Sequence, residues 1–225
     1  MSRREYETRA AVHPARERER VLDAIRAALR PRPEAPAAAA APADALCALP
    51  APGDAALRRF LAECAANCTE VILVRSPAEA DTALAQILAP VEGGFYAQDA
   101  PELRRLLAPW AGRTLWSNAG ACDAERAAGL TLAEALIAQT GSIVVSAACG
   151  GRAGSVLPDL HIVVARASQL APSLAATLSA LGPAFERASM ACVITGPSRT
   201  ADIEKLLVLG AHGPRRLVLL LRLDA

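Results

Sequence analysis

The stretch LHIVVARASQLAPSLAATLSALGPAFERASMACVIT, residues 160–195, alternates between strand-like and helix-like patterns. It begins with LHIVVA, an apolar run of strand length, and continues with APSLAATLSAL, which favours a helix. A second apolar run of strand length, MACVIT, closes the stretch. Strands that are buried on both faces of a parallel sheet read as continuous apolar runs. The order therefore predicts an α/β fold with a mostly parallel sheet flanked by helices.

The same alternation continues on both sides, from a helix expected at roughly 54–67 to the C-terminal run RLVLLL. Ser76 stands three residues before Glu79, which is the spacing of a capping box and predicts the start of a second helix. Thr131 and Glu134 have the same spacing and predict a further helix in TLAEALIA. The other expected strands are 71–74, 93–97, 113–117, 141–147 and 216–221.

Residues 1–50 have a different character from the rest of the chain. ARERERVLDAIRAALR places Val21, Leu22 and Ile25 on one side, which predicts an amphipathic helix. Its charges alternate in sign, so this helix suits packing on a protein surface better than binding to anionic lipid. A Pro/Ala-rich linker follows it. We therefore expect an N-terminal helical extension with its linker, and an α/β domain over 51–225.

The composition excludes several functional classes. The 24 Lys and Arg residues nearly balance the 23 Asp and Glu residues, and no basic stripe interleaved with aromatic residues is present, so nucleic-acid binding is not expected. The charged first residues do not resemble a signal peptide, and the apolar runs are too short to predict a membrane span. The six cysteines form neither a CxxC pair nor a ferredoxin-type run, so we expect no metal site or cluster built by this chain alone.

The stretch ITGPSRTADIE ends the strand MACVIT at a Gly-Pro pair and is expected to start a helix near residue 201. In open α/β sheets, ligands collect at the carboxyl ends of strands, where free helix amides and a nearby arginine suit an anion. Alternatively, Ser198 or Thr200 only caps the helix while Arg199 pairs with an acidic neighbour. The candidate anion contacts are Gly196, Pro197, Ser198, Arg199 and Thr200.

A second candidate wall comes from two segments upstream. Thr140, Gly141 and Ser142 lie where the expected helix of TLAEALIA meets a strand, and the glycine suits a helix C-cap there. Arg152 supplies a charge within the glycine-rich loop CGGRAGS, whose backbone can approach a ligand closely. The same loop could equally be a simple connection between two strands.

Two histidines complete the set of candidates. His161 lies inside an apolar run, where a core histidine is the default interpretation and a functional role the alternative. His212 lies in LGAHGP, between a glycine expected to cap a helix, Gly210, and a Gly-Pro pair. It is a candidate ligand contact or acid/base group, or else a turn residue that donates to a carbonyl.

Asp202 and Glu204 follow the candidate anion site. They are two residues apart on the expected helix, so their side chains diverge and do not form an acid/base pair. We expect them to support the loop, for example by pairing with Arg199 or Arg152. The sequence contains neither a GxSxG elbow nor an HExxH motif, and we identify no complete catalytic constellation in it.

The segments TGSIVV, GGRAGSVLPDLHIVV, TGPSRTADIE and LVLGAHGP occur in this order. Together they resemble the LUD domain of the lactate-utilization family, in particular its short C-type subunits. The resemblance is close over about 131–222, extends only to the layout over 54–130, and hardly includes the first 50 residues. It implies a fold related to ribose-5-phosphate isomerase, glucosamine-6-phosphate deaminase and the CoA transferases.

The resemblance also implies a function. It points to a cytoplasmic, accessory subunit of a bacterial system that oxidises L-lactate to pyruvate, with the iron–sulfur clusters held by two partner proteins. The alternative is a stand-alone enzyme acting on a phosphorylated or CoA-linked small molecule. Members of the family usually have Glu where this chain has Gln139. Because glutamine is neither a carboxylate base nor an acyl acceptor, a covalent mechanism like that of the CoA transferases is not expected at this position.

Overall fold

The computed structural model describes residues 14–28, 54–118, 122, 126–147, 152–185, 188–201, 207–210 and 212–223. The chain divides into two units, Met1–Leu46 and Cys47–Ala225. In the first unit, α2 spans Pro14–Ala28, and its residues Val21 and Ile25 are exposed. The boundary predicted near residue 50 lies outside the described residues.

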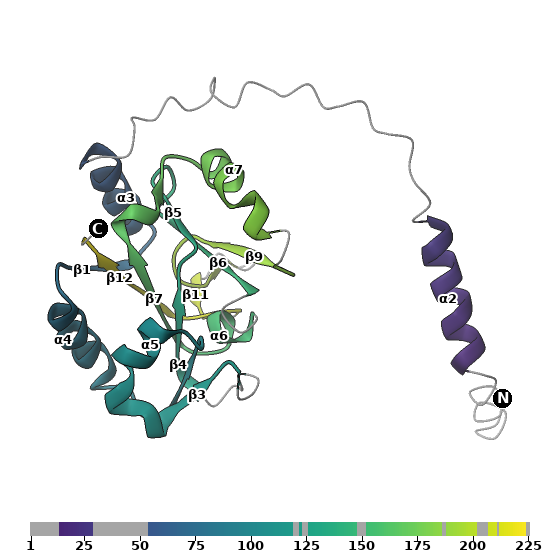
Figure 1. Cartoon of the computed structure of the whole chain (residues 1–225), viewed down its shortest axis with the longest axis horizontal. Coiled ribbons are helices and arrows are strands. Elements are labelled where there is room, and N and C mark those ends of the chain that lie inside the picture. The colour runs from purple at the N-terminus through teal and green to yellow at the C-terminus, as the bar shows by residue number, and fades with distance from the viewer. Residues whose placement is uncertain are drawn as a thin grey trace. The chain divides into compact units, whose positions relative to one another are not determined.

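A six-stranded sheet forms the centre of the second unit, in the order β1-β12-β7-β4-β2-β3. Every neighbouring pair in it is parallel, which confirms the predicted mostly parallel sheet. The two most apolar strands, β7 and β12, lie next to each other inside the sheet (Figure 1). The strands are β1 (Glu70–Val74), β2 (Gly94–Ala97), β3 (Thr114–Trp116), β4 (Arg126–Leu132), β7 (Leu160–Arg166) and β12 (Arg216–Arg222).

Helices cover one face of this sheet. They are α4 (Pro77–Leu88), α5 (Pro101–Leu106) and the short 3-10 helix η1 (Ala108–Arg113). Leu84 and Leu103 from these helices pack with Ile162 of β7 in one buried cluster. The predicted cap of α4 is present, because the Ser76 hydroxyl accepts a hydrogen bond from the Glu79 amide at 3.1 Å. Burial of each such large apolar side chain stabilises the fold by about 1.5–3 kcal/mol.

A second, smaller sheet and α3 (Asp54–Ala66) cover the opposite face. The smaller sheet has the order β8-β5-β6-β9, and β6 is antiparallel to both of its neighbours. Its outer face is covered by α7 (Leu174–Phe185), which lies on the side away from α4 and α5 (Figure 1). The strands are β5 (Ala135–Ile137), β6 (Ser142–Ser146), β8 (Leu170–Ala171) and β9 (Ala191–Ile194).

The helix predicted in TLAEALIA is wrong. Thr131 belongs to β4, where it pairs in register with Val163 of β7 and is fully buried. Glu134 does not close a capping box; its carboxylate accepts a hydrogen bond from the Ser146 hydroxyl at 2.6 Å. The surrounding sheets provide partners for this apolar segment on both sides, and such tertiary pairing outweighs a local helix signal.

Gly129 of β4 shows how closely the layers pack. A Cβ at this position would lie 2.0 Å from the carbonyl oxygen of Gly154 in α6 (Ala153–Val156). A Cβ on Gly154 would in turn lie 2.6 Å from the ring of Tyr96 on β2. Both contacts involve atoms that cannot move away independently, so α6 rests directly on the sheet only because these two residues are glycines.

We therefore expect Gly129→Ala to lower the free energy of unfolding by about 2 kcal/mol or more, because the added methyl overpacks a backbone contact. Gly112→Ala is the matched control, since a Cβ on Gly112 would meet nothing within 4 Å. Urea unfolding of the two variants and the parent protein measures both effects. Equal stability of Gly129→Ala and Gly112→Ala would contradict the packing described here.

Candidate functional site

A cavity of about 330 Å³ lies where the smaller sheet meets the amino ends of β7 and β12. Strand β9 and the turn after it form one wall, and residues of α6 form another. Several residues that the sequence marks as candidate ligand contacts line this one cavity. They are Arg152, Gly196, Pro197, Ser198, Arg199 and His212.

The helix expected after Arg199 is wrong. Arg199–Ala201 forms strand β10, which pairs antiparallel with β11 (Leu207–Leu209). The pairing continues into Ser198, whose carbonyl oxygen accepts a hydrogen bond from the Gly210 amide at 3.0 Å and whose own amide donates to Pro214. Residues 198–201 therefore pair in a hairpin, and the cradle of helix amides expected here is absent from the described residues.

This hairpin also changes the roles expected for its neighbours. Thr200 lies in β10. Gly210 follows a strand instead of capping a helix, although its φ of +78° still requires a residue without a Cβ. Asp202 and Glu204 lie outside the described residues, so their support of the loop stays a prediction. The cavity lies at the carboxyl end of β9 but at the amino ends of β7 and β12, in contrast to the usual position in open α/β sheets.

Thr140 and Gly141 lie in the turn between β5 and β6, and Ser142 begins β6; none of the three is among the residues that line the cavity. Gly141 caps no helix, but its φ is +61° and a Cβ there would lie 2.6 Å from the Cys64 amide nitrogen. The Ser142 hydroxyl bonds to the Thr195 hydroxyl at 2.8 Å, and Thr195 does line the cavity. These three residues therefore lie behind the cavity wall and not on it.

Asn67, just after α3, holds in place both the turn between β5 and β6 and the turn after β9. Its side-chain amide donates a hydrogen bond to the Thr140 carbonyl at 2.9 Å. Its own carbonyl accepts a hydrogen bond from the Arg199 guanidinium at 3.1 Å. Gly196 passes so close that a Cβ would lie 2.3 Å from that carbonyl oxygen. No sequence pattern indicates this residue, because its partners are 73 and 132 positions away.

The charges on the cavity lining favour an anion. Arg152 and Arg199 both line it, and no Asp or Glu stands among its described lining residues. Ser198 is held by the hairpin, and its hydroxyl accepts a long hydrogen bond, 3.4 Å, from the His212 amide. His212 itself is exposed at the rim. The arrangement can attract a small anion through guanidinium groups, which bind carboxylates and phosphates well.

His161 lines the same cavity and is fully buried. Its Nε2 lies 2.9 Å from the Thr131 hydroxyl oxygen, whereas its Nδ1 has no hydrogen-bond partner among the described residues. Burial lowers the pKa of the imidazole to about 4, so the ring is neutral near neutral pH. From the sequence alone its role is open, because the pattern shows only a polar residue inside a continuous apolar strand.

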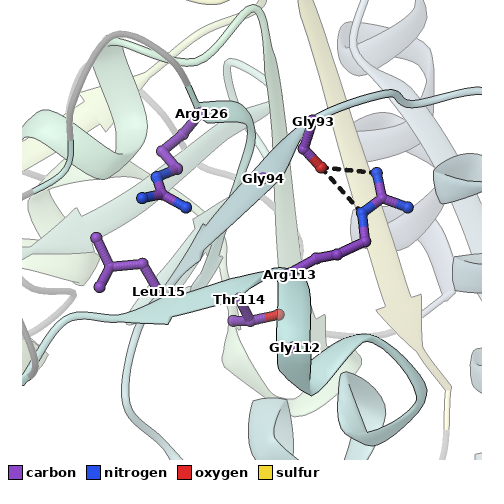
Figure 2. Close-up of a pocket in the computed structure, with 7 residues that line it drawn as sticks. All are labelled: Gly93, Gly94, Gly112, Arg113, Thr114, Leu115 and Arg126. Atoms are coloured by element: carbon purple, nitrogen blue, oxygen red, sulfur yellow. Dashed lines mark hydrogen bonds between the residues drawn. The ribbon is translucent and has the colours of Figure 1, made fainter.

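A second hollow, of about 510 Å³, lies beside β2 and β3 and also contains two arginines. Figure 2 shows the Arg113 side chain directed to the Gly93 carbonyl, to which it donates at 2.9 and 2.7 Å. Its guanidinium also lies over the Phe95 ring, 4.6 Å from the centroid. Arg113 is thus committed to the fold, which makes this hollow a poorer candidate than the cavity around His161.

Comparison with known proteins agrees with this fold. Residues 117–221 match the LUD domain. A crystal structure of a DUF162 family protein from Deinococcus radiodurans aligns with a TM-score of 0.59 and 25% identity, covering 76% of this chain and 96% of that one.

The names of curated relatives are more specific than the name of the domain. The chain is 34% identical over 110 residues to lactate utilization protein C of Macrococcus caseolyticus, covering 44% of this chain and 48% of that protein. It is 39% identical over 104 residues to the protein of the same name from Bacillus pumilus, covering 44% and 43%. It is 40% identical over 98 residues to the uncharacterized protein YkgG of Escherichia coli, covering 41% and 42%. The matches thus span less than half the length of these relatives.

In the described part of the chain, no helix is both long enough and apolar enough to cross a membrane. The same residues hold no group of three or more His, Cys, Asp or Glu side chains that could bind a metal ion.

The burial of His161 makes stability depend on pH. Its pKa is lowered from 6.5 to about 4 on folding, so the unfolded chain binds a proton that the folded chain does not. This contribution to stability is complete above the unfolded pKa of 6.5 and is lost as the pH falls toward 4. We expect a loss of about 2 kcal/mol from this residue between about pH 7 and pH 5.

Urea unfolding of the parent protein and of His161→Gln at the two pH values measures this loss. The variant is expected to show a shallower dependence on pH, because glutamine does not titrate. An equally steep dependence in both proteins would assign the acid sensitivity to other groups.

Proposed function

We propose that this chain serves lactate utilization as an accessory LUD-domain subunit, and that the cavity between its two sheets binds a small carboxylate. The names of its relatives support the role in lactate utilization. The observation that carries the binding site is the cavity itself, to which Arg152 and Arg199 contribute charge and to which no described acidic residue contributes. Guanidinium groups suit the two oxygens of a carboxylate.

An accessory role fits the chemistry of the lining better than a catalytic one. The described lining residues include no carboxylate that could act as a general base, and His161 is neutral and buried. Gln139 lies in the turn between β5 and β6, outside that lining, and cannot form an acyl intermediate. Oxidation of lactate then requires electron carriers on other chains, and we propose iron–sulfur proteins as these partners.

The binding site is tested by calorimetric titration of the purified protein with L-lactate, pyruvate, inorganic phosphate and CoA. We expect the two short acids to bind, and Arg152→Ala or Arg199→Ala to weaken them roughly tenfold to a hundredfold, as for a lost charged hydrogen bond. Arg58→Ala is the matched control, since it removes the same charge from an exposed position outside the cavity. Tight binding of CoA or phosphate without the acids would favour a stand-alone enzyme instead.

The role in the cell is tested by deleting the gene and growing the strain on L-lactate as the only carbon source. We expect growth to fail and to return with the parent gene but not with the double variant Arg152→Ala/Arg199→Ala. Affinity purification from the parent strain is expected to recover proteins that contain iron–sulfur clusters, identified by their visible absorbance and bound iron. Normal growth of the deletion strain together with no such partner would reject the proposal.

A further inference from the structure

His161 occupies an unusual position for a polar side chain. It pairs in register with Gly129 of β4 on one side and with Leu217 of β12 on the other, on the face of the sheet that the smaller sheet covers. Gly129 brings no side chain to that face, so Thr131, two residues further along the strand, can reach the ring. The imidazole is thus held at the wall of the cavity by one hydrogen bond.

The hydrogen-bonding groups around His161 indicate which of its ring nitrogens carries the proton. If Nε2–H donated to Thr131, the Thr131 hydroxyl hydrogen would have no acceptor among the described residues, and Nδ1 would be a bare acceptor. If the Thr131 hydroxyl donates to Nε2, both the hydroxyl hydrogen and Nε2 are satisfied, and only an Nδ1–H donor is left over. A buried polar group without a partner destabilises the protein, so the second arrangement, which leaves one such group instead of two, is favoured.

We propose that His161 is a ligand contact, in which Nδ1–H donates a hydrogen bond to an oxygen on the second carbon of a short carboxylic acid held by Arg152 and Arg199. The inference rests on the proposed function and names the class of ligand for its site: 2-hydroxy and 2-oxo acids. Thr131 is the positioning residue, because it touches the imidazole and sets its tautomer.

The different burial of His161, Arg152 and Arg199 sets the orientation of the ligand in the cavity. His161 is fully buried at the floor of the cavity, whereas Arg152 and Arg199 are exposed at its mouth. Guanidinium groups match the charge of the carboxylate, and the neutral imidazole donates to an uncharged hydroxyl or carbonyl oxygen without adding a second positive charge. An acid that lacks this oxygen would leave the Nδ1–H donor without a partner, which is how buried polar groups discriminate between ligands.

The test compares L-lactate and pyruvate with propionate, which has the same carbon chain but no oxygen on the second carbon. We expect the parent protein to bind lactate or pyruvate about tenfold more tightly than propionate, as for one buried hydrogen bond. His161→Leu should remove this preference while binding of propionate stays within about twofold. Urea unfolding of His161→Leu confirms that the variant is folded before it is titrated.

A spectroscopic measurement covers the case in which His161→Leu does not fold. Nitrogen-15 NMR of the imidazole in the parent protein is expected to show the Nδ1–H tautomer, with the Nδ1 resonance shifted by lactate and not by propionate. Thr131→Val keeps the histidine and the side-chain volume but removes the hydroxyl. We expect it to mix the two tautomers and to reduce the preference for lactate over propionate, which a merely structural loss of stability would not do.

The outcomes separate this inference from the proposed function. If all three acids bind the parent protein equally and Arg152→Ala weakens all of them, the site stands and the role of His161 is wrong. An Nε2–H tautomer in the bound state would also overturn it. If none of the acids binds the parent protein, both proposals fail.

Discussion

The structure depends on the pairing of β7 with β12, two parallel strands that are buried on both faces of the sheet. Ile162 and Leu220 pack against helices on one face, while Val163 and Leu219 pack against α3 and the smaller sheet on the other. Each fully buried side chain of this kind stabilises the fold by about 1.5–3 kcal/mol. Because both faces of these strands are apolar and exposing them to solvent is unfavourable, the fold needs a covering layer on each side of the sheet.

The candidate site is a consequence of the second covering layer. The smaller sheet packs over β7 and β12, and the cavity opens at their amino ends, where β9 and the turn after it meet α6. Asn67 fixes that turn from behind by bonding to Arg199 and to the neighbouring turn at Thr140. The position of the guanidinium at the mouth is therefore set by the end of a helix more than a hundred residues earlier in the chain.

The two capping-box patterns, at Ser76 and at Thr131, have the same spacing but lead to different secondary structures. At Ser76 the pattern starts a helix, because the segment that follows has one polar and one apolar face and packs as α4. At Thr131 it does not, because Thr131 belongs to β4, between β2 and β7, and the residues that follow form β5 of the smaller sheet. The helix expected after Arg199 failed for a similar reason, since β11 provided an antiparallel partner for the same residues. A local helix signal determines the secondary structure only where no neighbouring strand can pair with the same residues.

By itself, the sequence determined the α/β class, the parallel core strands and the group of segments that carries the family resemblance. The fold class and the core strands follow from the apolar runs, which indicate which segments must be buried. Only the tertiary structure placed β9 in a second sheet, brought Arg152 and Arg199 to one cavity, and left His161 at its floor with Nδ1 unpaired among the residues that the structure describes. The physical reason is that the local run of apolar residues determines whether a segment is buried. The partner that each strand or polar atom contacts depends on segments that are far away in the sequence.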